Sequence, residues 1–241
     1  FVLKFFLKIY ILNKTNYMKI IMKYSFALLA IIVASSCQKI RNSQKPEFKY
    51  YNFCPDGPDL LLLVDNWSNF PNGVAYKQSS GNYYGTYPYD NDGSQALKVQ
   101  SKNTGMKYLE TQISLKDYYK HAIFTAGSVL DIDQLTIPAF PESGSGCKIR
   151  FVNLCPNCDT VSLLLNGVNY TGKVPYLSAS DYVNVTADSV TADVRKTNSV
   201  IVATERKINL PGYRTVNIVL SGYKDAVGVQ YLPSITVVSE N

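Results

Sequence analysis

The chain has 241 residues, 46% of them apolar and 17% charged, which is enough to bury the cores of two modest domains. Tyrosine occurs 19 times and histidine once, a balance that suits a β-rich protein outside the cytoplasm. The formal charge of +6 comes mainly from five lysines in residues 1–36, and beyond them 19 basic residues stand against 18 acidic ones. A nearly neutral chain lacks the electrostatic footprint of a nucleic-acid-binding protein, so we expect no nucleic-acid partner.

The segment that ends at Cys37 has the layout of an export signal. Lys19 and Lys23 precede an apolar run over residues 26–33, and small residues occupy positions 34–36. The run is too short to cross a bilayer as a permanent helix, which takes about 20 residues. The segment resembles a bacterial lipoprotein signal, in which the cysteine becomes the lipidated N-terminus. An ordinary secretory signal with an incidental cysteine is the alternative.

The lipoprotein interpretation sets the expected layout of the N-terminal region. Residues 1–36 form the signal segment, with a short signal helix, and residues 1–17 precede the first methionine as an upstream extension. Cys37 carries acyl chains such as palmitate, and each buried methylene contributes about 0.8 kcal/mol to membrane anchoring. Residues 37–46 form a polar tether. Gln38, by resemblance to enterobacterial sorting, favours the outer membrane of the cell envelope, facing the periplasm rather than exposed at the surface.

The rest of the chain contains two related stretches. Residues 49–66 align with residues 150–167 at a constant offset of 101, and both contain Asn-x-Cys-Pro. Residues 113–127 align with residues 208–222 at an offset of 95, and each ends in glycine. Because the two blocks keep their order and their spacing, the sequence predicts a duplicated domain.

The predicted fold class is all-β, with two tandem Ig-like or Greek-key β-sandwich domains. The first domain spans residues 47–138, a Pro-, Gly- and Ser-rich linker spans 139–146, and the second domain spans 147–241. Short apolar or alternating runs start every 8–12 residues, as in β-sandwiches. In the second domain these runs are Lys148–Leu154, Val161–Leu165, Tyr182–Thr186, Val190–Val194, Val200–Ala203, Thr215–Leu220 and Ser234–Val238.

The second domain also carries a family resemblance. Its "KIRFVNLCP", "VSLLLNG" and "LPGYRTVNIVLSG" segments resemble the bacterial family known as domain of unknown function 4397. The first domain is a weaker copy, because Lys49-Tyr50-Tyr51 stands where the family has Arg-Phe-Val. The resemblance implies a β fold and an envelope lipoprotein, and it implies no particular activity.

Four cysteines besides Cys37 remain to be explained. Cys155 and Cys158 lie in a turn before a strand, and we expect a disulfide there. A redox site would need a helix N-terminus, and structural zinc would need four ligands, so both are disfavoured. If the first domain's chain leaves at the end that holds Cys54, the linker brings Cys147 nearby, and a second disulfide, Cys54–Cys147, is predicted. Four free buried cysteines are the alternative.

Aromatic residues are the best candidates for ligand contact. They are Trp67, Tyr83, Tyr84, Tyr87 and Tyr89, and all but the tryptophan fall in the stretch "SGNYYGTYPYD". Successive strand residues point to opposite faces, so some of these rings are expected to face outward and meet a glycan or an envelope protein. The alternative is that they cover a sandwich edge or pack the domain junction.

No motif in the sequence predicts a catalytic residue, a metal site or a cofactor. We therefore predict a membrane-anchored, non-catalytic binding or structural module. One alternative is an assembly or adhesion subunit that pairs by strand addition. The other is an enzyme with a site at the domain junction, near the single histidine, His121.

Overall fold

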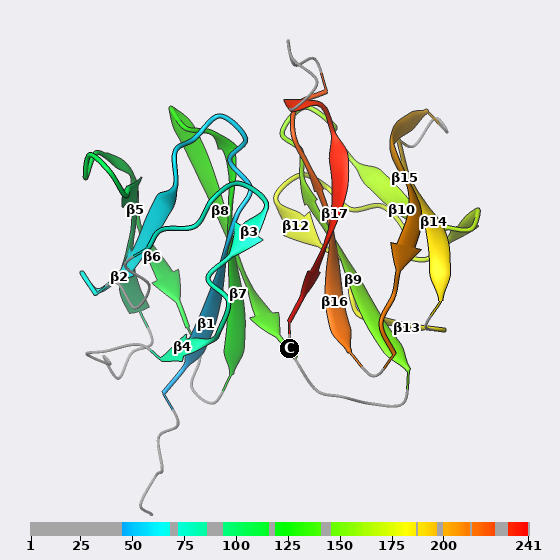
Figure 1. Ribbon diagram of the computed structural model, residues 1–241, viewed down its shortest axis with the longest axis horizontal. Helices are drawn as coiled ribbons and strands as arrows, with labels where there is room; N and C mark the ends of the chain where they lie inside the picture. The colour runs from blue at the N-terminus through cyan, green and yellow to red at the C-terminus, as the bar shows by residue number, and fades with distance from the viewer. Residues whose placement is uncertain are drawn as a thin grey trace, which may run out of the picture. The chain divides into compact units, whose positions relative to one another are not determined.

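The computed structural model describes residues 45–67, 72–85, 94–115, 119–140, 146–186, 188–196, 200–212, 214–224 and 231–240. Within these ranges the chain forms strands and no α-helix, which confirms the all-β prediction. The predicted signal helix lies outside the described residues. Residues 44–241 form one compact unit. We call residues 45–140 the first half and residues 146–240 the second half (Figure 1).

The first half builds two facing sheets. One has the strand order β3-β1-β7-β8, with β4 also paired to β1, and the other has the order β2-β5-β6. The strands are β1 (Glu47–Asn52), β2 (Leu60–Val64), β3 (Gln78–Ser79), β4 (Tyr84–Gly85), β5 (Ser94–Ser101), β6 (Lys107–Ser114), β7 (Lys120–Ser128) and β8 (Asp131–Ala139).

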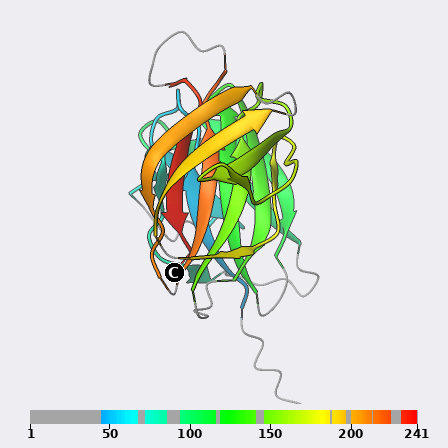
Figure 2. The ribbon, with the colours of Figure 1, turned by 90° about the vertical axis from the view of Figure 1, so that its right-hand side faces the viewer.

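The second half builds two sheets in the same way. One has the order β12-β9-β16-β17, with β13 also paired to β9, and the other has the order β11-β10-β14-β15. Figure 2 looks onto β14 and β15, which cross obliquely in front of the sheet behind them. The strands are β9 (Cys147–Leu154), β10 (Val161–Leu165), β11 (Val168–Asn169), β12 (Ser178–Ala179), β13 (Val183–Val185), β14 (Ser189–Lys196), β15 (Ile201–Asn209), β16 (Thr215–Ser221) and β17 (Ser234–Ser239).

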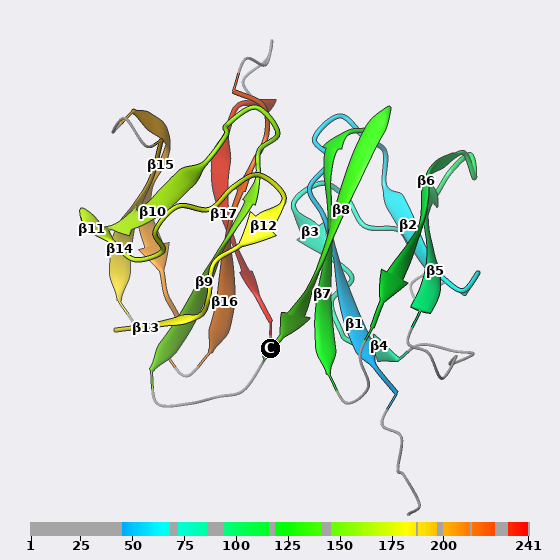
Figure 3. The same ribbon diagram turned by 180° about the vertical axis from the view of Figure 1, so that it is seen from behind.

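Strand pairing follows one scheme in both halves. β1 runs parallel to β7, and β7 runs antiparallel to β8. Likewise β9 runs parallel to β16, and β16 runs antiparallel to β17. Figures 1 and 3 show each trio side by side from opposite faces. The two halves therefore have the same strand pairing among the described residues, and the isolated bridge between Val64 and Trp67 in the first half corresponds to the pairing of Leu165 with Val168 of β11.

We call β3-β1-β7-β8 and β12-β9-β16-β17 the inner sheets, and β2-β5-β6 and β11-β10-β14-β15 the outer sheets. The outer sheets show the burial pattern of a sandwich. β2 and β10 alternate buried and half-buried residues, so one face packs inward and the other faces solvent. Each half has its own core between its two sheets. The side chains of Tyr50, Leu62 and Ile123 are fully buried in the first core, and those of Phe151, Leu163 and Ile218 are fully buried in the second.

The inner sheets are buried on both faces. All seven residues of β16 are buried, and seven of the nine residues of β7 are buried. The outward-facing residues of these strands form a third apolar cluster, which joins the two halves. Its members include Tyr51, Phe53 and Phe124 of the first half and Val152, Leu154 and Val219 of the second. We call this contact between the halves the junction.

The second aligned stretch ends in a glycine in both halves, and the structure shows why glycine is needed there. Gly127 and Gly222 both have positive φ, at 81° and 104°, where glycine is favoured. A Cβ at Gly127 would lie 2.5 Å from the carbonyl oxygen of Asp131, and one at Gly222 would lie 2.5 Å from that of Leu232. Both positions require glycine because the returning strand passes against the backbone.

Candidate functional site

The predicted lipidation site, Cys37, lies outside the described residues, so its role stays a prediction. Among the residues that the structure does describe, no helix has the length and apolar character to cross a membrane.

The predicted aromatic residues do not share one surface. Trp67 is 54% exposed and follows a tight turn after β2, in which Asp65 and Asn66 have positive φ. Tyr83 packs into the junction cluster, while Tyr84 packs against the core of the first half and donates its hydroxyl to Ser80 O. Tyr87 and Tyr89 lie outside the described residues. Of the three aromatics that the structure places, Trp67 alone is prominently exposed.

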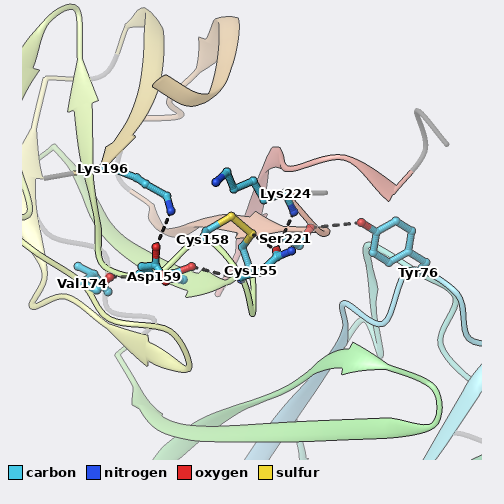
Figure 4. Close-up of a disulfide and its surroundings, with 10 residues drawn as sticks. Tyr76, Cys155, Cys158, Asp159, Val174, Lys196, Ser221 and Lys224 are labelled. Atoms are coloured by element: carbon cyan, nitrogen blue, oxygen red, sulfur yellow. Dashed lines mark hydrogen bonds and ion pairs between the residues drawn. A yellow bond between two sulfur atoms is a disulfide. The ribbon is translucent and has the colours of Figure 1, made fainter. Parts of the chain in front are cut away.

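The Cys-x-x-Cys turn contains a disulfide between Cys155 and Cys158, as the sequence analysis expected (Figure 4). The backbone N–H of Cys155 bonds the Asn153 side chain, and the N–H of Lys224 bonds the Asn157 side chain. A strand follows the turn, and both cysteines are fully buried. The bridge thus fixes a turn at the end of β9.

The predicted disulfide between Cys54 and Cys147 is wrong, because both thiols are free and buried. Cys54 belongs to the core of the first half and Cys147 to that of the second. The error lies in where the chain leaves the first half. Ala139, at the end of β8, pairs with Lys120 of β7, and Lys120 pairs with Glu47 at the start of β1. The chain therefore leaves at the end opposite Cys54.

The Asn-x-Cys motifs have the same local structure in both halves. Asn52 Nδ2 donates to Val74 O over 2.8 Å, and Asn153 Nδ2 donates to Val174 O over 3.2 Å. Each asparagine also accepts from the N–H two residues later, at Cys54 and Cys155. These buried amides satisfy backbone groups where the chain turns out of the inner sheet.

His121 lies in the middle of the inner sheet. It belongs to β7, between Phe48 of β1 and Pro138 of β8, and it is only 3% exposed. In the aligned block its counterpart is Val216, an apolar residue. The described residues contain no group of three or more His, Cys, Asp or Glu that could hold a metal ion.

The polar groups that the structure does bring together lie at one end of the junction. Arg150 of β9 forms an ion pair with Glu240, and the side chains are 5% and 0% exposed. Arg150 Nε donates to Asn217 Oδ1 over 2.9 Å, and Nη1 donates to Pro138 O of the first half over 2.6 Å. The Tyr182 hydroxyl donates to Glu240 over 2.7 Å.

This buried carboxylate also connects the halves directly. The backbone N–H of Phe140, in the first half, donates to Glu240 Oε2 over 3.1 Å. The Phe140 ring meets the Tyr182 ring edge-on at 5.8 Å, and the Arg150 guanidinium lies 4.5 Å from the centre of the Tyr182 ring. Every partner of Glu240 named here is a hydrogen-bond donor, as a buried carboxylate requires.

Lys49 lies in the corresponding position of the first half. Its ammonium donates to Ser239 O over 3.0 Å and lies 5.8 Å from the centre of the Tyr83 ring. Burial lowers the pKa of Lys49, and the Glu240 carboxylate partly opposes that effect. The Tyr51 hydroxyl also donates to Ser239 O over 3.0 Å.

Sequence reasoning did not identify this polar cluster. Arg150 stood inside the quoted strand pattern, and a cation within an otherwise apolar strand was the available signal. Glu240 gave no signal, because a carboxylate next to the last residue of the sequence resembles an exposed terminus. Only the tertiary structure places it against Arg150.

Comparisons with known proteins support the domain in the second half. Residues 147–236 match the model of a family described as Domain of unknown function (DUF4397), which confirms the resemblance for that region. Among solved structures the chain is similar to CBMbc, a family CBM26 module from Eubacterium rectale Amy13K in complex with maltoheptaose. That match has 12% identity and a TM-score of 0.26, and it covers 81% of this chain and 97% of the other. A likeness at that score carries no argument about function. A comparison with curated proteins gives no match.

Proposed function

We propose that this chain is a non-catalytic module of the cell envelope. Lipid on Cys37 holds it at a membrane, and two β-sandwiches act as one rigid body that presents its loops to a ligand or partner. The observation that carries the proposal is the junction, where apolar side chains and cross-half hydrogen bonds join the sandwiches. Loops on a rigid β scaffold are common binding elements.

The two sandwiches also support a proposal about domain organisation. We propose that residues 47–138 and 147–241 are two copies of one domain, the second of which contains the match to the family model. The matching strand orders and the equivalent amides of Asn52 and Asn153 support this assignment.

Three groups in the described part of the chain that could perform chemistry lie in buried environments. Burial raises the pKa of the Cys54 thiol to about 12, so this thiol is a poor nucleophile at neutral pH. Glu240 is completely buried and ion-paired with Arg150, and His121 lies within the inner sheet. These environments favour a binding or structural role over an enzyme site at the junction.

Trp67 is the residue that we assign to ligand contact. Its backbone is hydrogen-bonded to Val64 directly after a tight turn, so the scaffold fixes the position of this residue while its side chain is 54% exposed. A half-exposed tryptophan can stack on a sugar ring or fill a pocket in a partner protein. Val168 occupies the same position after the Asn166-Gly167 turn of the second half and is 58% exposed.

Binding to solubilised envelope fractions tests this assignment, because those fractions contain both glycans and partner proteins. Immobilised wild-type protein should retain a glycan or protein component that Trp67→Ala loses, by about 30-fold if the ring is a hot spot worth about 2 kcal/mol. Val168→Ala is the matched control and should retain it. Equal retention by wild type and Trp67→Ala would refute the role of Trp67.

Metabolic labelling tests the anchor separately. Cells fed an alkyne-bearing palmitate should label the full-length wild type and leave Cys37→Ser unlabelled, and only the wild type should remain with the outer membrane after fractionation. An unlabelled wild type would contradict the lipid anchor.

Strand addition is the less favoured alternative. β15 lies at the end of its sheet in the pairing order, and Val200 and Ile201 at its start are exposed. However, its pairing with β14 is interrupted by two register shifts, and it carries the exposed charges of Glu205 and Lys207. Irregular pairing and charge are the features by which natural edge strands avoid adding partners.

A further inference from the structure

Two of the hydrogen bonds across the junction form a reciprocal pair. Lys49 of β1 donates to the Ser239 carbonyl of β17, and Arg150 of β9 donates to the Pro138 carbonyl of β8. The two donors are equivalent, because they stand at the same place in the aligned stretches of β1 and β9.

The two acceptors are equivalent as well. Pro138 is paired with His121, which is level with Phe48, the residue before Lys49. Ser239 is paired with Val216, which is level with Ile149, the residue before Arg150. Each half therefore offers the same donor position and the same acceptor position to the other.

Two tyrosine contacts cross the other end of the junction. The Tyr76 hydroxyl lies 3.4 Å from Ser221 Oγ in the second half, and the Tyr176 hydroxyl donates to Asp133 Oδ2 in the first half over 2.7 Å (Figure 4 shows the Tyr76 contact). The tyrosines occupy equivalent places just before β3 and β12. Their partners lie at the same level of the inner sheets but on non-equivalent strands, because Asp133 belongs to β8 and pairs with Ala126, whereas Ser221 belongs to β16 and pairs with Ser234.

The apolar part of the junction shows the same relation. Tyr51, Phe53 and Phe124 of the first half occupy the same strand positions as Val152, Leu154 and Val219 of the second, and all six lie in one buried cluster. The first half contributes the larger side chains and the second half the smaller ones. Matched positions of opposite size let the two faces interdigitate.

We infer that the junction is a two-fold pairing surface, and that the partner this sandwich face fits is a second sandwich of the same kind. Contacts in which position i meets j′ and position j meets i′ are the signature of an isologous interface, as found in homodimers. In this chain the two subunits of such a dimer are joined by residues 141–145. The inference rests on the proposed equivalence of the two halves, and it goes beyond the envelope role.

Glu240 is the departure from this symmetry that provides the test. Glu240 is paired with Thr215, and the equivalent pair in the first half is Ala139 with Lys120. Ala139 should therefore lie in the same relation to Lys49 and Tyr83 as Glu240 does to Arg150 and Tyr182. Consistently, the Tyr83 hydroxyl is buried and has no hydrogen-bond partner among the described residues, whereas the Tyr182 hydroxyl donates to Glu240.

The experiment introduces a carboxylate at Ala139, the position equivalent to Glu240, in the full-length chain, and measures unfolding by urea. If the surface is two-fold, Ala139→Glu places a carboxylate beside Lys49 and the Tyr83 hydroxyl, and the unfolding midpoint stays at or above that of the wild type. Ala126→Glu is the control, since Ala126 is equally small and buried in the same cluster but lacks this donor set. It should lower the midpoint sharply, because a buried unpaired carboxylate is costly.

A double-mutant cycle with Lys49 shows whether the new carboxylate pairs with the Lys49 ammonium or is only tolerated at this position. Lys49→Met should remove the cation that pairs with the new carboxylate, so that Ala139→Glu then lowers the unfolding midpoint as much as Ala126→Glu does. Lys49→Arg with Ala139→Glu, which reproduces the second half's charges, should be at least as stable as Ala139→Glu alone. The inference is overturned if Ala139→Glu is as damaging as the control in both the lysine and arginine backgrounds, or if Lys49→Met leaves its effect unchanged. Both results are independent of whether Cys37 is lipidated.

Discussion

The two halves of this chain have the same strand pairing and differ in what supports it. The second half matches a family model over residues 147–236, has a disulfide in its first turn and contains the buried Arg150–Glu240 pair. The first half has Cys54 free at the corresponding turn and Ala139 where the second half has Glu240. The buried asparagines and the turn glycines are present in both halves, together with a separate apolar core in each. The disulfide and the buried ion pair are further supports that, in the described part of the chain, only the second half has.

The largest effect is expected from removing the buried ion pair, which among the described residues only the second half has. Glu240→Ala should cost about 3–5 kcal/mol of unfolding free energy, because it leaves the Arg150 guanidinium buried without its counterion. Urea denaturation followed by circular dichroism measures the loss. Asp131→Ala, which removes an exposed carboxylate from β8, is the control and should change stability by less than about 0.5 kcal/mol. A similar small change for Glu240→Ala would show that the pair contributes little to stability.

A second pair of variants tests the feature that the halves share. Asn52→Ala and Asn153→Ala should each cost about 1–3 kcal/mol, because each leaves a buried backbone N–H without its acceptor and removes one of the donors to a buried backbone carbonyl. The two losses should be similar, since the two amides share two bonds to equivalent residues and each makes one more, Asn153 to Asp159 O and Asn52 from Thr125 Oγ1. The exposed Asn169→Ala is the control for both. A large loss in one half and none in the other would mean that only one turn depends on its asparagine.

The smallest expected effect concerns the free thiol that distinguishes the first half. The pKa of Cys54 is raised by burial from its usual 9 to about 12, so folding favours the protonated thiol. The corresponding contribution to stability is complete below about pH 9 and is lost as the pH rises from about 9 toward 12. At pH 8.5, iodoacetamide should leave Cys54 of the folded protein unmodified and alkylate it in urea.

The same thiol can be tested by alkaline titration. In Cys54→Ala, the loss of stability between pH 9 and 12 should be shallower than in the wild type. An unchanged pH dependence, or rapid alkylation of the folded protein, would contradict a buried thiol.

Much of this architecture was accessible from the sequence because its signals are local. The run Val161–Leu165 coincides with β10, and the runs beginning at Thr215 and Ser234 begin β16 and β17. β15 was predicted too short, since its polar continuation to Asn209 lacks apolar alternation. The two-residue strands β11 and β12 are too short to have a periodicity.

The candidate site was less predictable because its determinants are tertiary. Tyr83 was expected to be a candidate for ligand contact, with junction packing as the alternative, and only the fold shows that its ring packs into the junction. The Cys54–Cys147 error came from an incorrect strand direction at the exit of β8, which no local pattern specifies. Arg150 and Glu240 are 90 residues apart, and their pairing depends on the order of strands in the sheet.

The central claim is that the two sandwiches form one body, and scanning calorimetry of the intact protein tests it most directly. The account predicts a single unfolding transition whose calorimetric enthalpy equals its van't Hoff enthalpy, since neither half keeps its inner sheet covered without the other. Two separate transitions, or an enthalpy ratio near two, would show that the halves unfold independently and would contradict it.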